Sequence, residues 1–333
     1  MPDNVILENY AKKKPEILAD TVSKIGDAAL QPARLLMDYA VGSAAYDAPA
    51  LMLKFCEWLR VHPPVQSGIS VEKLIEAVRE EFLRYKELSE NKPLIAMLEG
   101  AADHVSVFKV SEESELNGDD EMVEHADKLL AFLLDYNRNE AGFLVDELAM
   151  EGTPIPEVYC EVITPVMREI RRKWYLGQLN SGHVYFIGAA FDLIISQLYS
   201  YLFAMDKKDE KVVITTLKPD PLDFTARMVS DLFEQAKWKT NYLGVITDYK
   251  PAAPVLLEAD PDLVILNAPF PVKPQECLGL IKDLKQERPG VKVMISGAVA
   301  HAEPDLFLDN GADALFETPD AEVTEIASGL LKS

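Results

Sequence analysis

The sequence predicts an α/β fold plus an all-α part: a flavodoxin-like five-stranded parallel sheet at the C-terminus, preceded by a four-helix cap bundle and an N-terminal helical domain. Three observations lead to this prediction. Apolar residues recur at three- and four-residue spacing up to about residue 206. Beyond it, short β-branched runs alternate with amphipathic stretches, which is typical of βαβ units. These runs are continuously apolar, as in parallel strands buried on both faces.

The N-terminal helical domain is expected to cover residues 1–110. No strand-like alternation interrupts it, and Ser70, followed by Glu72 and Lys73, is predicted to cap one helix. Its helices are expected at residues 17–25, 33–39, 48–61, 71–85 and 94–105.

An acidic segment, residues 111–121, separates this domain from the next. It holds six acidic residues and an Asn117-Gly118 pair without an apolar period, so we expect a linker or an exposed loop. The cap bundle is expected at 122–206, because four helical stretches follow one another with short connections. These helices are expected at residues 121–136, 139–150, 155–175 and 180–204.

The C-terminal domain is expected at 207–333. Its ligands should bind beyond the carboxyl ends of the strands, in the loops that follow Leu217, Asn267, Ser296 and Phe316. The strands are predicted at 211–217, 239–243, 262–267, 291–296 and 314–316, and the helices between and after them at 223–236, 273–286, 304–309 and 320–331.

Charge and cysteine content narrow the range of partners. The net charge of −22 argues against binding to nucleic acid or to anionic lipid, since both require basic surface. The tight basic cluster, residues 168–173, is expected to be the solvated face of a helix. Asp192 interrupts the most apolar stretch, residues 184–205, which therefore predicts a buried helix and not a membrane span. Three scattered cysteines fit reduced thiols and a cytoplasmic location.

Several short motifs of the C-terminal domain resemble those of a known family. They are residues 218–229 after the first strand, Tyr242-Leu243-Gly244, residues 262–267, Ser296-Gly297 and residues 311–314, and in the cap residues 162–179. Together they resemble the cobalamin-binding domains of methionine synthase, corrinoid methyl carriers and cobalamin-based light sensors. The resemblance covers about residues 120–333.

The chain departs from the signature of that family, D-x-H-x-x-G, in which the histidine is the lower ligand of cobalt and the aspartate orients it. Asp220 holds the aspartate position, but the histidine position is Leu222 and the glycine position is Thr225. Leucine has no lone pair for a metal. A Cβ at position 225 also narrows the groove for the nucleotide tail. The resemblance therefore implies the fold without histidine-ligated cobalamin.

The cap and the tail groove supply the remaining candidates. Light-sensing relatives carry Glu-His facing the upper side of cobalt, where this chain has Val184 and Tyr185, and only the tryptophan, Trp174, is kept. Along the tail groove the chain has Asn267 and Ser296-Gly297, of which the glycine permits close backbone approach. The candidate cofactor-binding residues are Asp220, Leu222, Asn267, Ser296, Gly297, Trp174 and Tyr185. No catalytic residue and no metal site are expected.

Three classes of function remain open. The first is a sensor or regulator that binds another tetrapyrrole or no cofactor, since the resemblance includes regulators and relatives that hold heme or a bilin. Heme would take a ligand from His301, His183 or Tyr185, and a bilin would take Cys160 or a hydrophobic cleft. The second is a cobalamin-binding protein or corrinoid carrier in which the base of the cofactor stays on cobalt (base-on). The third is a ligand-free scaffold for a partner.

An enzymatic role is not expected. No G-x-x-x-x-G-K phosphate loop and no G-x-S-x-G nucleophile elbow occur. A phosphorylation receiver domain is disfavoured too, because Asn267 stands where that fold needs an aspartate. The sequence therefore predicts a protein that acts through a protein partner or a homo-oligomer.

Overall fold

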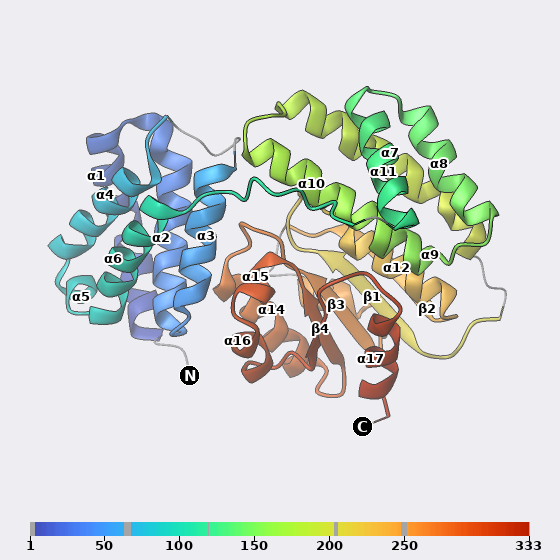
Figure 1. Ribbon diagram of the computed structural model, residues 1–333. Helices are drawn as coiled ribbons and strands as arrows, with labels where there is room; N and C mark the ends of the chain where they lie inside the picture. The colour runs from blue at the N-terminus through green and yellow to red at the C-terminus, as the bar shows by residue number, and fades with distance from the viewer. Residues whose placement is uncertain (1–3, 63–67, 119, 203–205, 248–251, 333) are drawn as a thin grey trace. The chain divides into compact units, whose positions relative to one another are not determined.

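The computed structural model describes residues 4–62, 68–118, 120–202, 206–247 and 252–332, which form two compact units (Figure 1). The first unit comprises residues 1–109, 270–278 and 301–306, and the second comprises residues 110–269, 279–300 and 307–333. Residue 119 of the predicted linker and residues 203 and 204 of the last predicted cap helix lie outside the described residues.

The N-terminal part of the first unit is helical, as expected. Ser70 caps its helix, since its Oγ accepts from the N–H of Lys73 at 3.3 Å. The first helix begins at Asn4 and not at residue 17, with Pro15 inside it; the lysine run before Pro15 hides its apolar spacing. The helices are α1 (Asn4–Ile25), α2 (Leu30–Ala45), α3 (Pro49–Val61), α4 (Val71–Arg84), α5 (Lys86–Ser89) and α6 (Lys92–Val107), with the short 3-10 turn η1 (Asp27–Ala29) between the first two.

A short C-terminal segment, residues 270–278, completes the core of this unit. The ring of Phe270 lies among Tyr39, Phe55 and Trp58, with centroid distances of 6.0, 6.3 and 6.1 Å. The hydroxyl of Tyr39 donates to the carbonyl of Val272. The N-terminal helices therefore share a core with the segment that follows the third strand, which the sequence did not indicate.

A buried carboxylate, that of Asp38 on α2, holds the same segment by charge. It accepts from the hydroxyl of Tyr10 at 2.7 Å, and it pairs with Lys14 at 2.6 Å and with Lys273 at 3.1 Å. Because Asp38 is almost fully buried, these partners offset the cost of removing its charge from water.

The second unit starts with the cap, and the four predicted helical stretches are confirmed. The third stretch contains a π-helical turn, η3 (Val158–Ile163). Helix α11 (Ser181–Leu202) is long and apolar enough to cross a membrane by length and composition, the one such helix in the described part of the chain, and 44% of its most apolar stretch is buried. The helices are α7 (Glu121–Leu134), α8 (Arg138–Met150), α9 (Ile155–Glu157), α10 (Thr164–Tyr175) and α11 (Ser181–Leu202).

The acidic segment before the cap is tied to α10. Arg172 donates through Nη1 to the carbonyls of Ser111 and Glu112, both at 3.1 Å. The N–H of Glu115 donates to Glu169 at 3.0 Å, and Glu169 also pairs with Arg172 at 2.7 Å. Arg172 is buried in this network and Arg171 is paired elsewhere, so the expectation of a solvated basic face is wrong for both. A run of basic residues in a sequence does not reveal which of them pairs with a carboxylate in the fold.

The sheet of the second unit has five parallel strands in the order β2-β1-β3-β4-β5, which confirms the flavodoxin-like prediction. Helices α12 and α17 cover one face and share a core with β1 and β3. The strands are β1 (Lys211–Thr216), β2 (Lys239–Val245), β3 (Leu263–Asn267), β4 (Lys292–Ser296) and β5 (Ala314–Leu315). The helices are α12 (Thr225–Gln235), α13 (Ala252–Leu257), α14 (Pro274–Glu287), α15 (Ala298–Ala302), α16 (Pro304–Asp309) and α17 (Glu322–Leu330), of which α13 and α15 were not predicted.

Candidate functional site

The candidate site lies where β1 and β3 run side by side. The chain leaves β1 towards β2 on one side and leaves β3 towards β4 on the other, so the loops that follow these two strands diverge. In doubly wound folds this switch point is where ligands bind. The loop after β1, residues 217–224, carries Asp220 and Leu222.

Asp220 is bound to the cap by an arginine. Arg171 on α10 donates through Nη1 to Oδ2 of Asp220 at 2.7 Å and through Nη2 to Oδ1 at 3.2 Å. The same Nη2 reaches the carbonyl of Leu222 at 3.1 Å. Burial alone would lower the pKa of Arg171, but the Asp220 carboxylate and Tyr175 outweigh it and raise the pKa. The carboxylate that would orient a histidine thus fixes the loop to α10.

Leu222, at the histidine position, is part of the cap core. It is 2% exposed and belongs to one apolar cluster with the cap helices, together with Phe224 from the same loop. The ring of Phe224 lies 5.9 Å from that of Phe191 on α11. The loop after β1 therefore packs directly on the cap.

Gly188 on α11 shows how close this contact is. A Cβ at this position would lie 2.5 Å from the carbonyl oxygen of Pro221, a distance that real Cβ atoms essentially never show. Helix and loop therefore approach as closely as a glycine allows. No planar macrocycle fits between them at this point.

Asn267 and Ser296, at the carboxyl ends of β3 and β4, are register partners and almost fully buried. The amide nitrogen of Asn267 donates to Asp223 at 2.8 Å. Asn267 Oδ1 and Ser296 Oγ have no hydrogen-bond partner among the described residues. Buried polar atoms without partners are uncommon, so this pair is the most ligand-like feature of the strand ends.

The backbone conformation at residue 297 and a close neighbouring backbone segment both require a glycine there. Its φ is +95°, and a Cβ would lie 2.6 Å from the carbonyl group of Ala268. The backbone that approaches this glycine closely is thus that of the neighbouring strand end. The sequence analysis expected this glycine to leave room for the tail of a cofactor, and its close neighbour in the structure is the backbone of Ala268.

The two cap candidates lie in different surroundings. Trp174 is 2% exposed in the cap core, in the same apolar cluster as Leu222. Tyr185 is 62% exposed on α11. The structure therefore brings Trp174, Asp220 and Leu222 together around α10, while Tyr185 projects into solvent.

The residues considered for other tetrapyrroles each have their own surroundings within their unit. The ring of His183, at the start of α11, lies 5.1 Å from that of Tyr136, whereas His301 on α15 belongs to the first unit. Burial, with a smaller effect of Asp320, raises the pKa of Cys160 to about 11, so its thiol is protonated near neutral pH. Within the described residues, no group of three or more histidine, cysteine or acidic side chains is placed to hold a metal ion.

Sequence reasoning missed the two residues that close the site, Arg171 and Gly188. Arg171 stands one helical turn before Trp174, so the motif that placed the tryptophan near the loop also placed the arginine there. Gly188 is a glycine in the interior of a long helix, a signal of close packing.

Comparison with known proteins identifies the module. Residues 210–327 match the model of the B12 binding domain family. Among solved structures, the monomethylamine corrinoid protein of Methanosarcina barkeri is 20% identical, with a TM-score of 0.52, and the match covers 63% of this chain and 98% of that one. This likeness shows a shared fold.

Two further solved structures match with lower TM-scores. A cobalamin-binding protein from Desulfitobacterium hafniense is 18% identical with a TM-score of 0.33, and the match covers 62% of this chain and 98% of that one. The methanol:cobalamin methyltransferase complex of Methanosarcina barkeri is 16% identical with a TM-score of 0.32, covering 69% of this chain and 89% of that one. No curated protein matches the chain.

The residues of the region that matches the B12 binding domain model do not fit a corrinoid held through a protein histidine. Leu222 has no lone pair for cobalt, and Asp220, which would orient a histidine, is held by Arg171. The contact between Gly188 and Pro221 also fills the gap between cap and loop at this point. The family match thus leads one to expect a bound corrinoid, whereas the residue at the ligand position leads one to expect no histidine-ligated cobalt.

Proposed function

We propose that this protein is a regulator that acts through a protein partner and uses its B12 binding domain as a closed structural module, without histidine-ligated cobalamin. The observation that carries the proposal is the burial of Leu222 in the cap core at the ligand position. At the position of the metal ligand the chain has an apolar residue that packs against the cap. We therefore infer that side chains of the protein itself, and not a cofactor, stabilise the contact between cap and sheet domain.

The energy of this packing supports the same proposal. Full burial of a leucine side chain stabilises a fold by roughly 1.5–3 kcal/mol, and Phe224 adds an aromatic contact to Phe191. A ligand that entered between cap and loop would have to compensate for these contacts and for the Arg171–Asp220 pair. If the cap stays packed on the loop after β1, none of these contacts is lost and no binding energy is needed to replace them.

The test is an absorption spectrum of the purified protein before and after incubation with cobalamin, heme and biliverdin, followed by desalting. The proposal expects no ligand band to survive desalting and no rise of the unfolding temperature with any of the three. A shifted band retained at one equivalent would contradict it and would name the ligand. Myoglobin, treated in parallel with heme, serves as the positive control.

Replacing Leu222 with histidine gives a sharper prediction. The Leu222→His variant should lose stability, because a polar ring enters an apolar core, and it should still not bind cobalamin, because Gly188 and Pro221 stay in contact. Thr225 also remains at the glycine position of the signature. Urea unfolding and a cobalamin titration measure the two effects. Tight cobalamin binding by this single variant would refute the steric argument.

A second candidate function is base-on cobalamin binding, as a cobalamin-binding protein or corrinoid carrier. The family match over residues 210–327 supports it, and so do the unpartnered Asn267 Oδ1 and Ser296 Oγ at the strand ends. This mode needs no protein histidine. It does need the cap to separate from the loop after β1. If cobalamin binds in the test above, Asn267→Ala and Ser296→Ala should weaken its binding, whereas Tyr185→Ala, which changes an exposed residue, should not.

A further inference from the structure

The strand ends that carry Asn267 and Ser296 lead directly into the segments that belong to the first unit. The chain passes from the second unit to the first after residue 269 and again after residue 300. The first of these crossings lies within three residues of Asn267, and the second lies within five residues of Ser296. Each strand end is therefore joined to the first unit by a very short covalent connection.

Backbone hydrogen bonds join the two connections to each other. The N–H of Ala268 donates to the carbonyl of Ser296 at 2.8 Å, and the N–H of Val299 donates to the carbonyl of Ala268 at 3.1 Å. Gly297 lies so close to Ala268 that a Cβ would stand 2.6 Å from its carbonyl group. Because of these contacts, neither connection can shift without the other.

The loop after β1 ties the same strand end to the cap. The amide nitrogen of Asn267 donates to Asp223 at 2.8 Å, and the carbonyl of Asn267 accepts from the N–H of Leu217 at 2.9 Å. Asp220, three residues before Asp223, is held by Arg171 of α10. The loop is therefore bonded to the cap on one side and to the end of β3 on the other.

We propose that residues 267–272 form a strap that couples the seating of the cap on the loop after β1 to the packing of the N-terminal helices. The strap ends in the aromatic core of the first unit, where Phe270 lies beside Tyr39 and the hydroxyl of Tyr39 donates to the carbonyl of Val272. When the cap leaves the loop, Asp223 moves, the end of β3 follows, and Phe270 is displaced in its core. The inference rests on the proposed regulatory function and names the route of its signal.

The test is hydrogen exchange of the full chain, followed by mass spectrometry. Arg171→Gln removes the pair with Asp220 and should raise the exchange rates of the α2 and α3 amides by about 5-fold or more, the lower end of typical couplings between sites. Asp223→Asn removes the acceptor for Asn267 but still accepts from the N–H of Thr225 at the start of α12. In the Asp223→Asn background, Arg171→Gln should change the α2 and α3 rates by less than about 2-fold, because the strap is already disconnected.

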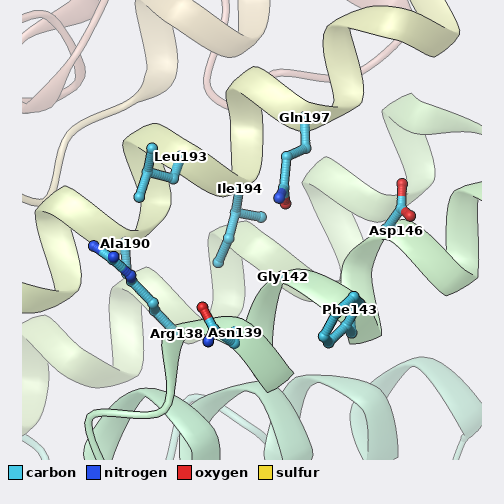
Figure 2. Close-up of a pocket in the computed structure, with 9 residues that line it drawn as sticks. All are labelled: Arg138, Asn139, Gly142, Phe143, Asp146, Ala190, Leu193, Ile194 and Gln197. Carbon is cyan, nitrogen blue, oxygen red and sulfur yellow. The ribbon is translucent and has the colours of Figure 1, made fainter.

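Two controls alter the cap without touching the strap. Tyr159→Phe removes a hydrogen bond of 2.7 Å from the cap to Asp231 on α12. Phe143→Ala truncates a side chain of α8 at the pocket between α8 and α11 (Figure 2), and no residue of the loop after β1 lines that pocket. Both variants should leave the α2 and α3 rates unchanged. Unchanged rates with Arg171→Gln, or an equal rise with Tyr159→Phe, would overturn the proposal.

The reverse direction tests the strap with a milder substitution. Coupling between two sites is reciprocal, so Tyr39→Phe, which releases the carbonyl of Val272, should raise the exchange rates of the loop after β1. The matched control is Thr21→Val, which removes a buried hydroxyl that donates within α1 to Ile17 at 2.8 Å, and it should leave that loop unchanged. No response of the loop to Tyr39→Phe would contradict the coupling. The cofactor spectra report on ligand binding alone, so failure of the strap and failure of the proposed function give different results.

Discussion

At the scale of the residue, Gly188 decides how cap and loop meet. Adding one methyl group there places Cβ 2.5 Å from the carbonyl oxygen of Pro221, and that oxygen is backbone, which cannot rotate away. We expect Gly188→Ala to lower the free energy of unfolding by about 1–3 kcal/mol, the usual cost of overpacking. Urea unfolding followed by circular dichroism measures the change.

The matched control for this prediction is Gly279→Ala on α14. It makes the same substitution in a helix, but a Cβ at residue 279 meets nothing within 4 Å. Alanine favours the helix over glycine by up to about 1 kcal/mol. The two variants should therefore shift stability in opposite directions. If Gly188→Ala also stabilises the protein, the close contact between cap and loop does not exist in solution.

At the scale of the element, η3 and α12 meet through a buried hydrogen bond. The hydroxyl of Tyr159 on η3 donates to Asp231 on α12 at 2.7 Å, and Arg227 lies 4.0 Å from the same carboxylate. Burial raises the pKa of Asp231 from 3.8 to about 6, although Tyr159 and Arg227 act in the opposite direction; Glu234 adds to the rise. The protonated form of Asp231 is therefore the one that the fold favours.

This shift predicts a dependence of stability on pH. Because the pKa is higher in the folded protein, the contribution of Asp231 is fully present below about pH 4 and is lost as the pH rises through about 6. The loss is on the order of 3 kcal/mol. Asp231→Asn cannot ionise, so its stability relative to the wild type should rise by that amount between about pH 4 and pH 8. Urea unfolding at several pH values measures it.

The control for the pH prediction is Asp309→Asn, which changes an exposed aspartate of α16. It removes one surface carboxylate and so controls for the change in net charge. A constant difference between Asp231→Asn and the wild type over the same range would show that the Asp231 carboxyl is not buried as described.

At this scale the sequence predicted which segments form helices and strands better than it predicted the contacts between these elements. The alternation of short strand-like runs with amphipathic stretches predicted all five strands. The continuous apolar runs of β1, β3 and β4 reflect burial on both faces, whereas β2 is a mostly exposed edge strand. The short helices α13 and α15 have too few residues for a period to show. Arg171 and Asp220 pair across 49 residues of chain, and nothing in the local pattern of either one specifies the other.

At the scale of the whole molecule, the first unit is not a contiguous stretch of sequence. Phe270 comes from the segment after β3, yet it lies among Tyr39, Phe55 and Trp58 of the N-terminal helices. Lys273 from the same segment pairs with Asp38. No pattern in residues 1–110 indicates that their core is incomplete without a segment more than 150 residues away. The N-terminal helices therefore depend on the C-terminal part of the chain for their packing.

This dependence gives the last prediction. Phe270→Ala should remove about 3–5 kcal/mol of stability from the first unit, since it opens a cavity in an aromatic core. Although the substitution lies in the C-terminal part, the amides of α2 and α3 should lose protection against hydrogen exchange, because these helices line the cavity. Mass spectrometry of deuterated peptides resolves the two units.

The matched control is Phe316→Ala, the same substitution at a similarly buried phenylalanine in the sheet core of the second unit. It should lower protection in β1, β3 and α12 and leave α2 and α3 unchanged. Loss of protection in α2 and α3 with Phe270→Ala but not with Phe316→Ala distinguishes a shared local core from general destabilisation. Equal loss with both variants would mean that the chain unfolds as a single cooperative body, and the segment after β3 would then have no special relation to the N-terminal helices.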